Sequence, residues 1–206
     1  MKKVSLIIIG TALSVMTSAQ GKYGKTPEDS VACIENLIYK DYMSSDPALA
    51  LSLWKKAIAV CPSSQLSLYI NGVKLYQGMI KNTTDAKLQQ AYKDTMYSIL
   101  DQRIVYFGDK AKVLGIKGQT MLVYSKTETQ KIFDVLNESI DLGGEETEAG
   151  TLVASMFAVS NLQKEGKKTQ ADVVEMYEKT SAIASKKQEE VYVEAQKTIQ
   201  SIAPTP

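Results

Sequence analysis

The residue types that most often carry out chemistry are scarce in this chain. Histidine is absent, which excludes serine–histidine–aspartate triads, cysteine–histidine pairs and histidine-ligated zinc. The chain holds 2 cysteines, too few for a structural zinc site or an iron–sulfur cluster. The chemistry that remains open is that of carboxylates, lysines and tyrosines, together with calcium or magnesium binding.

The densest group of carboxylates is GGEETEA, residues 143–149. Such a group could bind a cation or supply a catalytic carboxylate pair. Glutamate and threonine ahead of an apolar run are also favoured by the positive end of a helix dipole, and we adopt that interpretation. We therefore expect no enzyme activity, no catalytic residue, no metal site and no cofactor. An enzyme that uses carboxylates or a lysine is the remaining catalytic alternative.

Cys33 and Cys61 could form a structural disulfide bond or serve a redox reaction. A dithiol enzyme usually carries its cysteines as a C-x-x-C pair, whereas these two are far apart in the sequence. The pattern favours a structural bond, which requires that the elements carrying the two cysteines bring them together.

Those elements are helical. Apolar residues recur at helical spacing, as at Ile132, Leu136 and Ile140, and the alternation typical of strands never persists. Asp46 and Pro47 are typical of a helix start. The predicted helices cover about 29–43, 47–61, 64–80, 85–106, 109–124, 128–141 and 146–163, followed by one or two helices in 169–202.

These boundaries predict an all-α domain at 29–202, a flexible segment at 20–28 and a disordered tail at 203–206. Short connections between helices predict antiparallel neighbours. Gly115 and Gly118 form a Gly-x-x-Gly pair that is too degenerate for a phosphate cradle and favours close helix packing instead.

The hairpin geometry predicts that Cys33 and Cys61 are joined. Each lies 12–16 residues from the expected turn near 44–46, so antiparallel helices bring them level to within about 6 Å along the axis. A loop of this size would stabilise the fold by about 3.5 kcal/mol through lost chain entropy in the unfolded state. The alternative is two buried thiols that never meet.

A tetratricopeptide pattern occurs in the second predicted helix. Ala50, Trp54, Ala57 and Pro62 have the small–aromatic–small–proline spacing of such a repeat. With the number of helices, this pattern predicts antiparallel helix pairs stacked as a tetratricopeptide-like right-handed solenoid of about eight helices. A helical bundle is the alternative.

Residues 1–19 have the features of a signal peptide. Lys2 and Lys3 precede an apolar stretch that ends at Met16, and small residues follow up to Ala19. We expect cleavage after Ala19, a periplasmic or otherwise exported protein, and no membrane insertion after cleavage. The net charge of +1 and the absence of a basic block exclude a nucleic-acid partner.

Several segments resemble a family of exported tetratricopeptide-repeat-like proteins from Bacteroidetes. The segments are YGKTPED (23–29), CIENL (33–37), CPS (61–63), YINGVK (69–74) and SIDLGG (139–144). The resemblance implies a helical repeat fold in an envelope or periplasmic setting, and it implies no activity. Asp29-Ser30-Val31 is similar to the acceptor triplets for O-linked glycans in that phylum, which makes Ser30 a candidate for glycosylation.

The partner site is expected on the tyrosine-bearing face. The chain has 11 tyrosines against 3 phenylalanines, and tyrosine suits both grooves and core edges. The repeat pattern places five residues on a concave groove: Glu35, Tyr39, Tyr42, Tyr69 and Tyr76. We expect a non-catalytic scaffold that binds a segment of a partner protein in this groove. The alternative is a small-ligand or lipid carrier with an apolar pocket between helices.

Overall fold

The computed structural model describes residues 21–203, and all regular structure in this range is helical, as predicted. The α-helices are α1 (Pro27–Asn36), α2 (Tyr39–Tyr42), α3 (Pro47–Val60), α4 (Ser67–Lys81), α5 (Ala86–Phe107), α6 (Lys110–Tyr124), α7 (Thr129–Gly143), α8 (Ala149–Lys164), α9 (Gln170–Ala184) and α10 (Glu190–Ile202), with a 3-10 turn η1 (Gly144–Glu146) before α8. The predicted signal peptide and most of the predicted tail lie outside the described residues.

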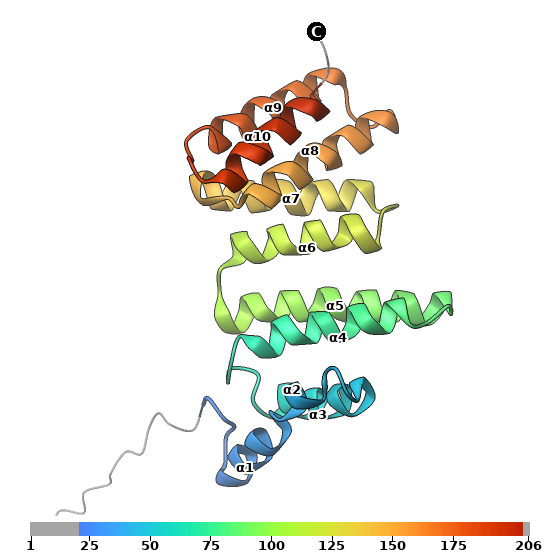
Figure 1. Cartoon of the computed structure of the whole chain (residues 1–206), viewed down its shortest axis with the longest axis vertical. Helices are drawn as coiled ribbons and strands as arrows, with labels where there is room; N and C mark the ends of the chain where they lie inside the picture. Colours follow the sequence, from blue (N-terminus) through green and yellow to red (C-terminus); the bar gives the residue numbers. More distant parts are fainter. Residues whose placement is uncertain (1–20, 204–206) are drawn as a thin grey trace, which may run out of the picture.

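The helices are stacked along one axis. Figure 1 shows the chain passing from α1 at one end of an elongated molecule to α9 and α10 at the other. Successive helices pack on each other from α3 to α10, and α6 packs on α8 and α8 on α10. Every helix in residues 21–203 is too short or too polar to cross a bilayer.

The structure divides one predicted helix and decides between the two alternatives for residues 169–202. The first predicted helix is divided into α1 and α2, because the chain tightens where the Asp41 amide bonds the Ile38 carbonyl three residues back. Residues 169–202 form two helices. Within residues 21–203 there are therefore nine helices of ten residues or more, and α2 adds one turn.

The prediction of a flexible segment at 20–28 is wrong for Pro27 and Glu28, which are helical. Helix α1 begins at Pro27 because Thr26 and Asp29 form a capping box. The Asp29 amide donates to Thr26 Oγ1 at 3.1 Å, and the Thr26 amide donates to Asp29 Oδ2 at 3.1 Å. Asp29 is thus the third helical residue rather than the cap.

Trp54 joins α3 to α4. Its indole Nε1 donates to the Leu68 carbonyl at 2.7 Å, and a Cβ built on Gly72 would overlap the ring. Ala50 and Ala57 are fully buried, and Trp54 is 3% exposed. The prediction that these small and aromatic residues lie where helices touch is confirmed.

Two core clusters fill the stack. The larger one extends from α2 to α8, and the smaller one from α7 to α10. Gly115 and Gly118 allow α6 to approach its neighbours, because added Cβ atoms would meet Thr151 Oγ1 and the Leu136 side chain respectively. The packing role predicted for these glycines is confirmed.

A disulfide bond ties α1 to the end of α3. The sulfurs of Cys33 and Cys61 are 2.11 Å apart, the Cα atoms are separated by 5.9 Å, and both side chains are buried. The geometry agrees with the predicted pairing. The bond therefore holds the terminal helix against the rest of the stack.

We predict that Gly72→Ala destabilises the protein, whereas Gly78→Ala in the same helix does not. The new methyl group at position 72 would overlap Trp54, but at position 78 nothing lies within 4 Å. Since both changes gain the same helix propensity, Gly72→Ala should be less stable than Gly78→Ala by about 1–3 kcal/mol. Urea unfolding followed by circular dichroism measures the difference, and equal midpoints would contradict the close packing of Trp54.

We predict that the Cys33→Ala, Cys61→Ala variant loses about 2–5 kcal/mol of stability and keeps its helical circular dichroism. The bond closes a loop with a sequence separation of 28, and the helices have packing of their own. Chemical denaturation gives the stability, and peptide mapping without reductant gives the pairing. Two free thiols in the exported protein would refute the bond.

Candidate functional site

The groove predicted from the tyrosines does not form. Tyr39 and Tyr69 are fully buried, and Tyr76 is 5% exposed, so the prediction that the three share an exposed concave surface is wrong. Tyr69 alone borders a groove, the apolar one described below. Tyr42 is partly buried against the larger core cluster, while Glu35 is exposed on α1. The alternative interpretation, that the tyrosines complete the core, is confirmed for the three buried ones.

The buried tyrosines bond to the backbone around the start of α4. Tyr39 donates its hydroxyl proton to the Ser67 carbonyl at 3.2 Å, and Tyr69 donates to the Pro62 carbonyl at 2.9 Å. The Tyr76 ring meets the Trp54 ring edge-on, with centroids 5.9 Å apart. Burial raises the pKa of Tyr39, Tyr69 and Tyr76 above the usual value for tyrosine. These side chains are joints between helices.

Ser30, the glycosylation candidate, lies in the first turn of α1. Its hydroxyl donates to the Thr26 carbonyl at 3.1 Å, and the residue is half-buried. Nothing in the fold tests its modification, which stays a prediction.

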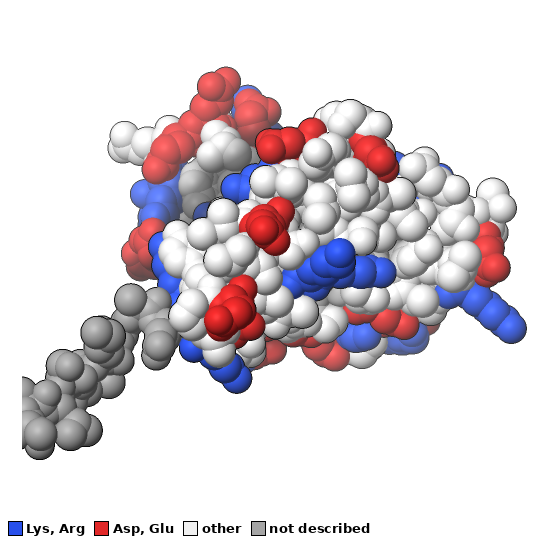
Figure 2. All heavy atoms as spheres, turned by 90° about the horizontal axis from the view of Figure 1, so that it is seen from below, with Lys and Arg blue, Asp and Glu red and all other residues white. Residues whose placement is uncertain are grey.

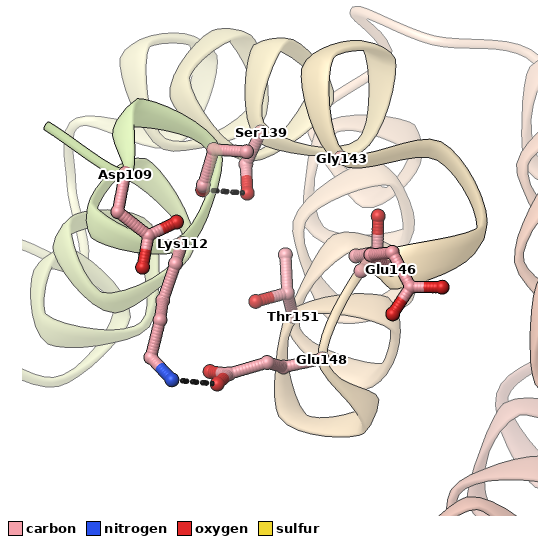
Figure 3. Close-up of a pocket in the computed structure, with 9 residues that line it drawn as sticks. Asp109, Lys112, Ser139, Gly143, Glu146, Glu148 and Thr151 are labelled. Atoms are coloured by element: carbon pink, nitrogen blue, oxygen red, sulfur yellow. Dashed lines mark hydrogen bonds and ion pairs between the residues drawn. The ribbon is translucent and has the colours of Figure 1, made fainter.

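A polar depression lies where the ends of α6, α7 and α8 meet (Figure 3). Its volume is about 170 Å³, below the range of about 300–1,000 Å³ usual for ligand pockets. Lys112 Nζ pairs with Glu148 Oε1 at 2.6 Å, and the Ser139 hydroxyl donates to the Ala111 carbonyl at 2.6 Å. The serine hydroxyl is thus held by a carbonyl rather than by a base.

The acidic segment 143–149 is held in ion pairs. Glu145 pairs with Lys186 and Glu146 with Lys187, both in the turn between α9 and α10. Among the described residues no group of three or more cysteine, aspartate or glutamate side chains is arranged to hold a metal ion. The carboxylates of this segment therefore connect α8 to the last helix pair.

An apolar groove opens between α4, α5 and α6, and we call it the α4–α6 groove. Helix α5 packs on both α4 and α6, whereas α4 and α6 do not pack closely on each other. Helix α5 therefore forms the floor between α4 and α6. The groove has a volume of about 370 Å³. It is lined by Tyr69, Ile70, Val73, Lys74 and Gln77 of α4, by Leu100 and Arg103 of α5, and by Lys112 and Ile116 of α6.

Arg103 is the unusual residue of this groove. It is the only arginine in the chain and is 8% exposed. It forms no hydrogen bond or ion pair with any described residue, and the nearby Lys112 is paired with Glu148 instead. Its nitrogens are not among the side-chain atoms that are sealed from solvent without a partner, so the guanidinium reaches the water in the groove while its alkyl part is buried.

The charged side chains that line the groove are all cationic, and the rim around them is apolar. Lys74, Arg103 and Lys112 line it, and no acidic residue does. The lining residue Ile70 is 40% exposed, and Leu66 and Tyr106 outside the lining are 37% and 44% exposed. The Tyr106 ring stacks on Tyr69 with centroids 6.1 Å apart. The groove is thus a cationic depression within a wider apolar surface.

A second apolar surface lies on the outer face of α1. Val31, Ile34 and Ile38 are 57%, 61% and 46% exposed at helical spacing. Figure 2 shows this end of the stack, where uncharged residues cover much of the face between separate charged groups. An apolar stripe exposed at the end of a helical stack is unusual, because helices that face water usually present polar side chains there.

Sequence reasoning missed the α4–α6 groove and Arg103. The segment 103–107 indicates only the end of a helix. The available signal was the apolar stripe of Met96, Ile99 and Leu100, because helical spacing places Arg103 on the same buried face.

Comparisons of the chain with protein-family models, with curated proteins and with solved structures found no match.

We predict that the protein is destabilised by alkali. The buried tyrosines keep their protons in the folded state, because burial raises their pKa. The free energy of unfolding should not depend on these groups below about pH 10, the usual pKa of tyrosine. It should fall above that pH, because the unfolded chain releases protons that the folded chain retains.

Circular dichroism and the ultraviolet absorbance of tyrosinate, recorded over the same titration, test this. Tyr69→Phe is the matched control and should weaken the pH dependence. It should also cost about 0.5–1.5 kcal/mol at neutral pH, since the bond to the Pro62 carbonyl is lost. Complete tyrosine ionisation with the helices intact would show that these side chains face solvent.

Proposed function

We propose that this protein is a non-catalytic periplasmic scaffold that binds a segment of a partner protein in the α4–α6 groove. The observation that carries the proposal is a groove of about 370 Å³ that is continuous with the exposed side chains of Leu66, Ile70 and Tyr106. Contiguous exposed apolar surface of this kind is typical of interaction sites.

The fold proposed for this scaffold is a tetratricopeptide-like right-handed solenoid. Its support is the contact of Trp54 with Gly72, the burial of Ala50 and Ala57, and the packing of α6 on α8 and α8 on α10. From α6 onward, every second helix thus contacts the next helix but one as well as its neighbour, as in stacked hairpins.

Export is proposed on two observations. The signal-peptide pattern of residues 1–19 directs a chain across the membrane, and the Cys33–Cys61 bond is of the kind that persists in oxidising compartments such as the periplasm.

The carrier of a small ligand or lipid is the competing function, and the shape of the groove disfavours it. Ile70 is both part of the lining and 40% exposed, so the groove is open along its rim. A small ligand would leave the apolar rim in contact with water, whereas a protein segment covers groove and rim together. A catalytic role is disfavoured because Glu146 and Glu148, two of the three carboxylates that line the polar depression, are held in ion pairs.

We predict that Ile70→Gln abolishes partner capture while Val193→Gln does not. Both residues are 40% exposed, so both changes should leave stability within about 0.5 kcal/mol. In the groove, the amide replaces an apolar contact and should weaken binding at least about tenfold. Val193 lies on α10, at one end of the stack, whereas α4, α5 and α6 lie in its middle (Figure 1).

The measurement is capture of proteins from envelope extracts under mild crosslinking, quantified for the three forms of the protein side by side. Equal capture by wild type and Ile70→Gln would refute the groove as the binding surface. Failure of the wild-type protein to capture any partner would refute the scaffold function itself.

A further inference from the structure

We infer that the segment bound in the α4–α6 groove is acidic and apolar, with an aspartate or glutamate that pairs with Arg103 and an apolar side chain beside it. This inference rests on the proposed function and names the chemistry of the partner. It assigns Arg103 as the residue that selects the partner.

The guanidinium of Arg103 has no partner among the described residues and reaches the water in the groove. Arg103 is 8% exposed and lines the groove, and the described residues offer it no hydrogen-bond or ion-pair partner. Guanidinium groups have five donors in a rigid fork that fits a carboxylate with two parallel bonds. A carboxylate in the groove would therefore supply the partner that the fold does not.

No acidic side chain in the lining of the groove competes for its cations. Glu148 pairs with Lys112, and Asp101 pairs with Lys117 further along α6. Asp109 is also near Lys112, but it does not line the groove. No acidic residue lines the groove, and Lys74 is exposed with no ion pair to a described residue. The groove thus has a net positive charge that complements an acidic segment.

Apolar side chains form a wall around Arg103 in the groove. Leu100 lies one helical turn before it on α5, and Val73 and Ile116 face the groove from α4 and α6. Exclusion of water by this wall strengthens a charged hydrogen bond. An apolar side chain next to the acidic residue would complete that exclusion, in the way that apolar contacts surround a binding hot spot.

The surface fits a peptide better than it fits an anionic amphiphile. A fatty acid could pair with Arg103 and fill the groove, but it would leave Leu66 and Tyr106 exposed beyond it. A folded or extended segment of a protein covers both regions at once. The amphiphile is therefore one of the outcomes that the experiment has to distinguish.

The test selects peptides from a display library of random short sequences on the exported protein, with counter-selection on Ile70→Gln, which changes the groove but not its charge. The affinity of each groove-dependent peptide is then measured for wild type, Arg103→Met, Arg103→Lys and Lys197→Met. Each peptide is also made with glutamine or asparagine in place of its acidic residue, which gives a double-mutant cycle with Arg103. Sodium decanoate is titrated against the same proteins as the amphiphile probe.

The expected result is a shared acidic residue next to an apolar one in the groove-dependent peptides. Arg103→Met should weaken binding at least about tenfold, and Arg103→Lys should weaken it less, because a lysine keeps the charge but not the fork. Loss of the acidic residue should weaken binding to wild type by a similar factor and hardly affect binding to Arg103→Met. Lys197→Met, which removes a cation from distant α10, should bind like wild type.

Two results would overturn the inference. Groove-dependent peptides without an acidic residue, or with one whose loss is equally costly in Arg103→Met, would refute the role of Arg103 and leave the scaffold function intact. Decanoate binding in the groove with no groove-dependent peptide selected would assign the groove to an anionic amphiphile and refute both proposals. Thermal unfolding of each variant shows whether a loss of affinity reflects a loss of fold.

Discussion

The contact between the Trp54 ring and the backbone at Gly72 determines how α3 meets α4, and the first half of the stack depends on it. No side chain fits between them, so the indole lies directly on α4 and donates to the Leu68 carbonyl. Tyr76 continues the contact, since its ring meets Trp54 on one side and Tyr92 of α5 on the other. One aromatic series thus fixes the order α3, α4, α5, and with it the first wall and the floor of the α4–α6 groove.

The other wall of the groove is α6, and its glycines bring this helix close to the helices that follow it in the chain. Gly115 and Gly118 bring α6 close to Thr151 of α8 and to Leu136 of α7, so α6 belongs with the helices that follow it. Ile116 lies between these glycines in sequence and turns to the groove. The groove is therefore the boundary between a part of the stack organised by aromatic rings and a part organised by close backbone contact. Its position follows from the packing on either side.

Signals within single helices predicted most of the fold. The residues that they missed are placed by contacts between helices. Asp46 and Asp85 cap α3 and α5 as expected, because a capping carboxylate needs only the amides of its own helix. Tyr39 and Tyr69 could not be placed in this way. A ring with a polar tip fits a groove or a core at the same spacing, and the outcome depended on the backbone carbonyls available near the start of α4. Arg103 was missed for a related reason, since a charged residue on an apolar stripe has no local partner to reveal its role.

The choice of cation at position 103 is itself an argument about function. The 24 basic residues include one arginine, and every ion pair among the described residues uses a lysine. These pairs are mostly exposed, where a hydrated ammonium suffices and contributes little to stability. At the buried position the chain has the cation that tolerates partial dehydration and recognises a planar anion. If the site served packing alone, an apolar side chain of similar size would be more stable there. A ligand carboxylate in the groove would give the guanidinium two parallel bonds that the fold does not supply, so the one arginine of the chain is the residue that gives the surface its selectivity.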